Sequence, residues 1–587
     1  MRIKLSWAKI LRIPSLLHTG VMNIVLGWII LLVNFTYLKA SASKAQPPHI
    51  VIIYVDDLGW NDISFHGSPQ IPTPNIDALA LNGITLQNYY GEWLCTPSRA
   101  SLLTGKYPMR LGLQHNVILA GEPMGLPLNE TTMPQHFKKF GYKTHMIGKW
   151  HLGYQTKEYT ATYRGFDSFF GYWNGMIDYY DHTYLETFCP SFTQPFYGLD
   201  LHDGLSPVRD AQGKYATNLF TERAEEVIKK HDTSKPLFMY LAHLAAHSGN
   251  LYQESQAPGD VVSQFKYITN LNRRIHAGVI KVMDDSVGAV FNALHQKNML
   301  ENTIFLVLSD NGGEVDPRVG FGSNYPLRGK KHTYWEGGFH LPALIWSPLL
   351  NLDKPRISRQ LMHVSDWLPT LYTVMGGNVE DLGLIDGYNL WQALVNDAPS
   401  PRTNMLQNLD TIAGTSAFRQ EHLKLVNGPP ISTFNSWYGP SGLGPTDTAT
   451  TYDWVFKNGS IVRDVLQEMD MWIVENPDHV YQNLRLTCEE PSSNETSLCD
   501  PSKNPCLFNI TADPCEYYDI ADQHPDTVDE ILKIIEKYRL EEMTPQDRAC
   551  DASANPMCHH FMYVPWLDPD YYQKCDFLSG GNSTIAS

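Results

Sequence analysis

The feature that most constrains this chain is an uninterrupted apolar run that ends in two carboxylates. Residues 50–55 are Ile-Val-Ile-Ile-Tyr-Val, and Asp56 and Asp57 follow directly. Because an apolar run rich in β-branched residues is typical of a strand covered on both faces, this run predicts a central parallel strand. Similar short runs follow at residues 142–147, 237–242, 304–308 and 341–346. Segments that could hold helices separate them, so the sequence predicts an α/β sandwich with a large, mainly parallel sheet.

Polar side chains stand just past four of these runs, where each predicted strand ends. They are Asp56, Asp57, Lys149, His151, His247, Asp310 and Asn311. Because parallel sheets gather their sites beyond the carboxyl ends of the strands, we expect these side chains to lie close together. The Asp-Asp and Asp-Asn pairs offer only oxygen donors, which suit calcium or magnesium better than zinc. Both pairs also suit tight turns, so the residues alone leave the roles of turn and metal ligand open.

A second segment carries a Cys, a Pro and an Arg at fixed spacing. Residues 95–105 are Cys-Thr-Pro-Ser-Arg-Ala-Ser-Leu-Leu-Thr-Gly. Pro97 suits the first turn of a helix, and Arg99 with the following residues continues it, so Cys95 would lie at the positive end of a helix. Such an end binds anions. The residues alone equally allow a buried or disulfide-bonded cysteine ahead of an ordinary helix.

This segment and a later one resemble the signatures of one enzyme family. The pattern Cys-x-Pro-x-Arg, followed by Thr104-Gly105, resembles the sulfatase signature, whose cysteine is oxidised to formylglycine. Residues 141–151 resemble the second signature of the same family. Residues 150–153 and 326–331 are most similar to the arylsulfatase B group, the N-acetylgalactosamine-4-sulfatases. The resemblance covers residues 47–400 and is thin beyond them, and it implies an alkaline phosphatase-like α/β sandwich.

The resemblance also implies a role for each matching residue. Cys95 would become the formylglycine nucleophile, with Arg99 holding its hydrate, and would ligate one Ca²⁺ per subunit. The other metal ligands would be Asp56, Asp57, Asp310 and Asn311. The remaining roles would be sulfate binding by Lys149 and Lys331, proton acceptance by His151, and proton donation to the leaving oxygen by His247 with Lys331.

Some of these assignments have a rival close by in the sequence. His243 lies four residues before His247, which we prefer because it stands in the loop past the predicted strand. Lys330 directly precedes Lys331, which the register of the surrounding motif favours. His182 resembles a residue of a substrate-side loop, although this aromatic segment would equally suit packing.

The first 42 residues have the composition of a targeting segment. Four basic residues accompany an uncharged run from residue 13 to residue 37, and Ala40-Ser41-Ala42 suits signal cleavage. The pattern predicts a signal peptide. The alternative is an uncleaved signal anchor, because the apolar run approaches the roughly 20 residues that span a bilayer. Entry into the secretory pathway agrees with five Asn-x-Ser/Thr acceptor sites, at Asn129, Asn458, Asn494, Asn509 and Asn582.

The chain has nine cysteines, so in an oxidising compartment one is left over. If Cys95 becomes formylglycine, the other eight can close four disulfides; the alternative is a free or intermolecular thiol elsewhere. Seven of the eight lie after residue 487, which predicts a cross-linked C-terminal region. For local bridges we expect Cys488–Cys499 and Cys506–Cys515. The disulfides of vertebrate relatives do not carry over, because residues 109–125 lack cysteine.

Length and charge bound the remaining possibilities. At 587 residues the chain exceeds one usual core, and we expect a catalytic domain at 47–400 and a cysteine-rich C-terminal α+β subdomain at 401–587. The net charge of -17 argues against nucleic acid and anionic membranes as partners, since both demand a basic face. A membrane association would follow only from an uncleaved leader.

Together these patterns predict a lysosomal or secreted sulfatase that hydrolyses the sulfate ester of a sugar or of a small aryl compound. Its other partner would be the formylglycine-generating enzyme, during maturation. One rival is a phosphatase or phosphodiesterase of the same superfamily, which Cys95 and the oxygen-only ligands disfavour. The other is an inactive sulfatase-fold binding protein, which an unmodified Cys95 would favour.

Overall fold

A computed structural model describes residues 46–68, 70–189, 195–316, 320–430, 435–438, 459–475, 477–488 and 499–571. The expected leader, residues 1–42, lies outside this part of the chain, as do Asn458, Asn494 and Asn582. The described residues from 47 onward belong to one compact unit. No helix within the described ranges is both long and apolar enough to cross a membrane.

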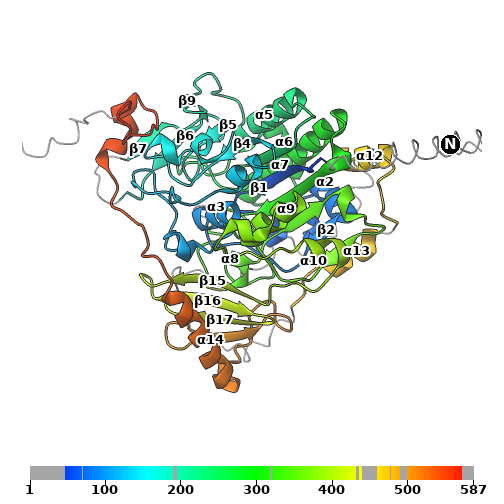
Figure 1. Cartoon of the computed structure of the whole chain (residues 1–587), viewed down its shortest axis with the longest axis vertical. Helices are drawn as coiled ribbons and strands as arrows, with labels where there is room; N and C mark the ends of the chain where they lie inside the picture. Colours follow the sequence, from blue (N-terminus) through cyan, green and yellow to red (C-terminus); the bar gives the residue numbers. More distant parts are fainter. Residues whose placement is uncertain are drawn as a thin grey trace, which may run out of the picture. The chain divides into compact units, whose positions relative to one another are not determined.

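A sheet forms the centre of this unit (Figure 1). It has ten strands, in the order β13-β2-β12-β11-β1-β10-β4-β5-β8-β9. The strands are β13 (Arg356–Ser358), β2 (Ile84–Leu86), β12 (Ala343–Trp346), β11 (Thr303–Ser309), β1 (His49–Val55), β10 (Leu237–Ala242), β4 (Lys143–Lys149), β5 (Ser168–Tyr172), β8 (His202–Asp203) and β9 (Ser206–Pro207). The five from β11 to β5 run parallel, whereas β12 is antiparallel to both of its neighbours. The predicted α/β class with a mainly parallel central sheet is confirmed.

Helices cover both faces of this sheet. Paired residues of parallel strands point to the same side, and Val51 of β1 pairs with Phe305 of β11. Phe305 packs against Phe291 of a helix, while Tyr54, on the opposite face of β1, bonds Ser98 of another helix. The main helices are α2 (Pro74–Asn82), α3 (Cys95–Thr104), α4 (Met133–Lys138), α5 (Ala216–Lys230), α7 (Leu271–Gln296) and α9 (Trp367–Val374). Helix α3 begins at Cys95, close to the start that Pro97 predicts.

A second, antiparallel sheet follows in the C-terminal part of the chain. Its strands are β15 (Asn404–Asp410), β16 (Thr415–Gln420), β17 (Leu423–Asn427) and β18 (Cys506–Asn509). Helix α14 (Pro525–Arg539) lies against it (Figure 1) and buries Val528, Ile531 and Ile535. Helix α12 (Ile461–Glu468) instead packs on α2 and α7, so the C-terminal region also covers the large sheet. The boundary at residue 400 stays a prediction.

Shorter elements connect these layers. The short strand pairs are β3 (Tyr89–Tyr90) with β14 (Met362–His363), and β6 (Thr183–Glu186) with β7 (Phe196–Leu199). The short helices are α6 (Gly259–Val262), α8 (Glu336–Phe339), α10 (Trp391–Asn396) and α13 (Pro477–Leu484).

The disulfides cross-link the C-terminal region, but not in the predicted pairs. Cys488 pairs with Cys515, and Cys499 pairs with Cys506, so both predicted local bridges are wrong. The two bridges are nested, because the 488–515 bridge encloses the 499–506 bridge in the sequence. A third disulfide joins Cys189 to Cys550, 361 residues apart. Among the described residues, Cys95 is the free cysteine.

Candidate active site

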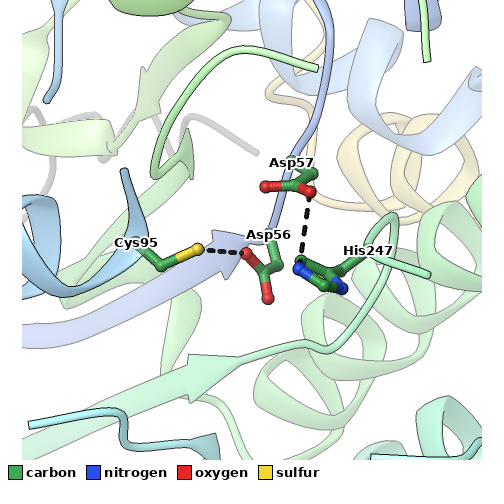
Figure 2. Close-up of side chains that lie close together, drawn as sticks. All are labelled: Asp56, Asp57, Cys95 and His247. Atoms are coloured by element: carbon green, nitrogen blue, oxygen red, sulfur yellow. Dashed lines mark hydrogen bonds and ion pairs between the residues drawn. The ribbon is translucent and has the colours of Figure 1, made fainter. Parts of the chain in front are cut away.

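The predicted site residues meet where the parallel strands end. Strands β1, β10, β4 and β11 stop at one edge of the sheet, since Val55 pairs with Ser309 and Ala242 pairs with Gly148. Asp56, Lys149 and Asp310 therefore stand next to one another, and they are fully buried. Figure 2 shows Cys95 of α3 and His247 of the loop after β10 directed toward the Asp56-Asp57 pair.

Cys95 is held with its thiol against a carboxylate. Its Sγ lies 3.3 Å from Asp56 Oδ1, and only 2% of the residue is exposed. Burial, and then the charge of Asp56, raises the pKa of the thiol far above its usual range. The unmodified side chain is thus a protonated thiol, which is a poor nucleophile.

Arg99 ties three elements together, one turn along α3 from Cys95. Its guanidinium donates to the carbonyl oxygen of Lys149 at 3.1 Å and to Asp310 Oδ2 at 2.7 Å. It also lies 3.7 Å from Asp56 Oδ1. Because the group is fully buried, these charged partners fix the ends of β1, β4 and β11 relative to α3.

Two lysines pair with the first two carboxylates. Lys149 Nζ donates to Asp56 Oδ2 at 2.6 Å, and Lys331 Nζ lies 2.8 Å from Asp57 Oδ1. Burial opposes ionisation of Asp57, but the charge of Lys331 prevails and lowers the pKa of that carboxyl below its usual range. Of the two adjacent lysines, Lys331 is the one at the site, because Lys330 binds Glu314 at 2.6 Å.

The oxygen donors fit a divalent cation. Asn311 donates through Nδ2 to Asp57 Oδ1 at 2.7 Å, while its Oδ1 is buried without a hydrogen-bond partner. Burial, and then the charge of Asp56, raises the pKa of Asp310 to about 6, and a bound cation would favour the ionised form of this carboxyl. Ligand atoms of Asp56, Asp57, Cys95 and His247 lie within 4.8 Å of one another. We call Asp56, Asp57, Asp310 and Asn311 the acidic cluster.

Two histidines face this cluster as neutral rings. His247 Nε2 lies 3.6 Å from Asp57 Oδ2, and its Nδ1 bonds the carbonyl oxygen of Ser248 at 2.8 Å. Burial and the charge of Lys331 lower the pKa of His247 to about 3. His151 bonds the carbonyl oxygen of Ile118 at 3.0 Å and leaves Nδ1 without a partner, and burial lowers its pKa too. The rival His243 is bonded to Ser286 at 3.0 Å.

Backbone strain accompanies these functional positions. Asp57 and His151 both adopt a left-handed backbone, with φ of 56° and 55°. Residues other than glycine adopt this conformation at a free-energy cost and tend to do so at functional sites.

A cavity of about 550 Å³ opens above the cluster. Its floor includes Asp57, Cys95, Lys149, His151, His247 and Lys331. Its walls, which the sequence did not identify, include Trp93, His115, Val117, Met176, Phe188, Leu251, His332 and Asp410. Most of them come from loops, and Asp410 is the last residue of β15. His182, predicted to contact substrate, does not line this cavity: it is fully buried, and its Nε2 bonds the carbonyl oxygen of Lys214 at 3.0 Å.

Several known proteins are similar to this chain in sequence. A family model described as Sulfatase matches residues 48–377. Arylsulfatase J of Mus musculus is 34% identical over 558 residues, which cover 91% of this chain and 83% of the relative. Arylsulfatase A of Homo sapiens is 32% identical, covering 63% of this chain and 72% of its own length. N-acetylgalactosamine-6-sulfatase of Homo sapiens is 30% identical, with coverage of 63% and 70%.

Solved structures agree with the fold. The crystal structure of Ps i-CgsB has a TM-score of 0.64 at 25% identity and covers 86% of this chain and 95% of its own. The PsFucS1 sulfatase from Pseudoalteromonas sp. shares the fold with a TM-score of 0.59 at 21% identity, covering 86% and 92%. The relatives named here do not single out the arylsulfatase B group, so that grouping stays a prediction. The family match, which spans more than half of the chain, shows that this chain belongs to the sulfatase family.

Proposed function

We propose that this sulfatase uses formylglycine made from Cys95, together with one bound Ca²⁺, to hydrolyse the sulfate ester of a sugar or of a small aryl compound. One observation carries the proposal. The free cysteine, Asp57 of the acidic cluster and two lysines line the floor of a single cavity, and Asp56 lies against the thiol of that cysteine. Formylglycine supplies a hydrated aldehyde, one hydroxyl of which attacks sulfur while the other allows release of sulfate.

The acidic cluster would hold the cation, with the side chain of residue 95 completing the ligand set. The unpaired oxygen of Asn311 and the crowded carboxylates support this assignment. Hard oxygen donors of this kind suit Ca²⁺. The cation supplies positive charge that stabilises an ionised nucleophile and the sulfate oxygens. Lys149 and Lys331, now paired with Asp56 and Asp57, would turn their ammonium groups toward the sulfate.

The remaining residues would position groups and move protons. Arg99, fixed by Asp310 and the Lys149 carbonyl, would hold the modified side chain in place. His151, neutral and with a free Nδ1, can accept a proton at the floor of the cavity. Lys331 keeps its proton at neutral pH, because Asp57 outweighs burial and raises the lysine pKa, so its ammonium group can donate a hydrogen bond to the leaving oxygen. His247 would share this role only in its protonated form, because burial lowers its pKa to about 3.

The names of the relatives point to two substrate types. Arylsulfatases A and J are named for aryl sulfates, and N-acetylgalactosamine-6-sulfatase is named for a hexosamine sulfate. We place N-acetylgalactosamine 4-sulfate, which the sequence resemblance implies, and the 6-sulfate among the candidate sugars.

We further propose maturation in the secretory pathway, with the lysosome or the extracellular space as destination. Disulfides at Cys189–Cys550 and in the C-terminal region support an oxidising compartment. The acceptor Asn129 is exposed, and Asn509 is half-buried at the end of β18. Formylglycine-generating enzyme would act on Cys95 during that passage.

The test combines peptide mass spectrometry with a release assay, on protein secreted from a eukaryotic host. We expect the tryptic peptide of Cys95 to carry the formylglycine mass, and the protein to release sulfate from 4-methylumbelliferyl sulfate faster than phosphate from the matching phosphate ester. The variant Cys95→Ala serves as the control and should be inactive. An unmodified Cys95 and no sulfate release, in a host that converts another sulfatase, would favour the binding-protein alternative; preferred phosphate release would favour the phosphatase.

A further inference from the structure

The wall of the cavity contains a histidine that the C-terminal sheet holds in place. His115 and Asp410 both line the cavity, although they are 295 residues apart. The Nδ1–H of His115 donates to Asp410 Oδ2 at 2.7 Å. Asp410 is the last residue of β15, and its side chain is fully buried. The ring of His115 keeps 29% of its surface exposed, so its other nitrogen, Nε2, is available to a bound molecule.

Hydrogen bonds hold the carboxylate of Asp410 in the position that orients the His115 ring. Its second oxygen, Oδ1, accepts from the backbone N–H groups of Ile412 at 2.9 Å and Ala413 at 3.1 Å. With both oxygens engaged, the carboxylate fixes the tautomer and the plane of the imidazole, as a carboxylate does for a histidine in many binding sites. The hydrogen bond to Asp410 also raises the pKa of His115, whose charge would be further favoured by Asp547 and Glu122.

The rest of the cavity wall has few positively charged groups that could bind an anion. Among the described residues that line the cavity, the only lysines are Lys149 and Lys331, and both belong to the floor; no arginine lines it. A charged His115 is balanced by Asp410. The other wall residues are largely apolar, and two of them are open at the mouth: Phe188 is 61% exposed and Leu251 is 42% exposed. A second negative charge on the substrate would therefore lose water without gaining a free cation.

We propose that His115, positioned by Asp410, is a specificity-determining residue that hydrogen-bonds through Nε2 to a hydroxyl group of an uncharged leaving group. A hydroxyl suits this contact because it can donate to a neutral ring and accept from a protonated one. The apolar wall packs against the body of the same leaving group. The inference rests on the proposed sulfatase activity and narrows its substrates to esters whose leaving group carries no second anion.

Three synthetic esters of similar size test the inference. They are 4-(hydroxymethyl)phenyl sulfate, 4-ethylphenyl sulfate, which replaces the hydroxyl by a methyl, and 4-carboxyphenyl sulfate, which adds a negative charge. For the wild type we expect the KM of the hydroxymethyl ester to be about fivefold below that of the ethyl ester, the size of one hydrogen bond. We expect the KM of the carboxy ester to be at least about tenfold higher than that of the hydroxymethyl ester, since it buries an unpaired charge.

Variants of His115 test whether this residue causes the difference in KM between the hydroxymethyl and ethyl esters. His115→Phe should remove the fivefold difference with kcat changed less than about twofold, whereas His115→Gln, which keeps a polar group, should restore part of it. The exposed His422 provides a matched control, His422→Phe, which should behave as the wild type. Three results would contradict this inference and leave the proposed sulfatase function intact. They are equal KM values of the wild-type protein for the three esters, a lower KM for the carboxy ester, and a KM for the hydroxymethyl ester that does not change in His115→Phe. If no ester released sulfate, the result would instead contradict the proposed sulfatase function on which this inference rests.

Discussion

At the scale of the residue, Asn311 contacts the acidic cluster through one end of its amide and leaves the other end unpaired. Its Nδ2 binds Asp57, and its Oδ1 is buried without a partner. We expect Asn311→Ala to lose at least half of the rise in Tm that added Ca²⁺ gives the wild type, because ligand-induced stabilisation falls with affinity. Differential scanning fluorimetry with EDTA and with CaCl₂ measures it. The exposed Asn396 supplies the control Asn396→Ala, and an equal rise in both variants would contradict the assignment.

The two adjacent lysines should separate function from stability. Lys331 pairs with Asp57 at the floor of the cavity, whereas Lys330 pairs with Glu314. We expect Lys331→Met to lower kcat/KM by at least about 100-fold, as for the loss of a group that stabilises developing charge. Lys330→Met should lower Tm but change kcat/KM less than about tenfold. Steady-state kinetics and thermal unfolding of both variants measure these changes. A larger loss of kcat/KM in Lys330→Met than in Lys331→Met would show that Lys330 is the lysine of the active site.

At the scale of the element, β4 reaches the site only because residue 148 has no side chain. A Cβ on Gly148 would lie 1.8 Å from the carbonyl oxygen of Ala242, and φ is +96°. We expect Gly148→Ala to lower the free energy of unfolding by about 4 kcal/mol or more and to displace Lys149. Gly141 has a similar φ of +83° but open space around it, so Gly141→Ala should cost only about 1 kcal/mol. Urea unfolding of both variants measures the difference.

Helix α2 carries a buried carboxylate that should make stability depend on pH. Asp77 accepts hydrogen bonds from Ser64, Thr73 and Tyr481, and burial raises its pKa to about 7 from an ordinary 3.8. A raised pKa means that the folded state holds the proton more tightly, so its contribution is complete below pH 3.8 and is lost as pH rises toward 7.

The variant Asp77→Asn removes this titration. Between pH 5 and pH 7 we expect the Tm of the wild type to fall relative to that of the variant by about 2 °C, and the gap to become constant above about pH 8, where the folded state has also lost the proton. Thermal unfolding of both proteins across this range is the measurement. A gap that does not change with pH would show that Asp77 is ionised throughout.

At the scale of the whole molecule, one disulfide spans most of the chain. Cys189–Cys550 closes a loop of 361 residues, whereas Cys499–Cys506 closes one of 7. Because a longer loop restricts the unfolded chain more, Cys189→Ser with Cys550→Ser should lower Tm by about 5 °C or more, and the shorter bridge should matter less. Scanning calorimetry of the two double variants compares them; equal losses would show that loop length is not the cause.

Sequence patterns predicted the parts of the molecule in which local chemistry dictates structure. Buried strands such as β1 and β10 follow from continuous apolar runs, and the floor of the site follows from polar residues at their ends. The disulfide pairs and the wall of the cavity did not follow, because they depend on which distant loops meet. His115 and Asp410 come into contact only when β15 reaches the cavity, and neither local sequence predicts that contact.

The burial of Cys95 restricts when its thiol can be modified. With 2% of its surface exposed, this side chain is out of reach for the active site of another enzyme once α3 has packed against β1. Any conversion of the thiol must therefore happen while the chain is still unfolded, in competition with folding itself. A molecule that folds first keeps its thiol for good, so the active fraction of a preparation is decided once, at synthesis.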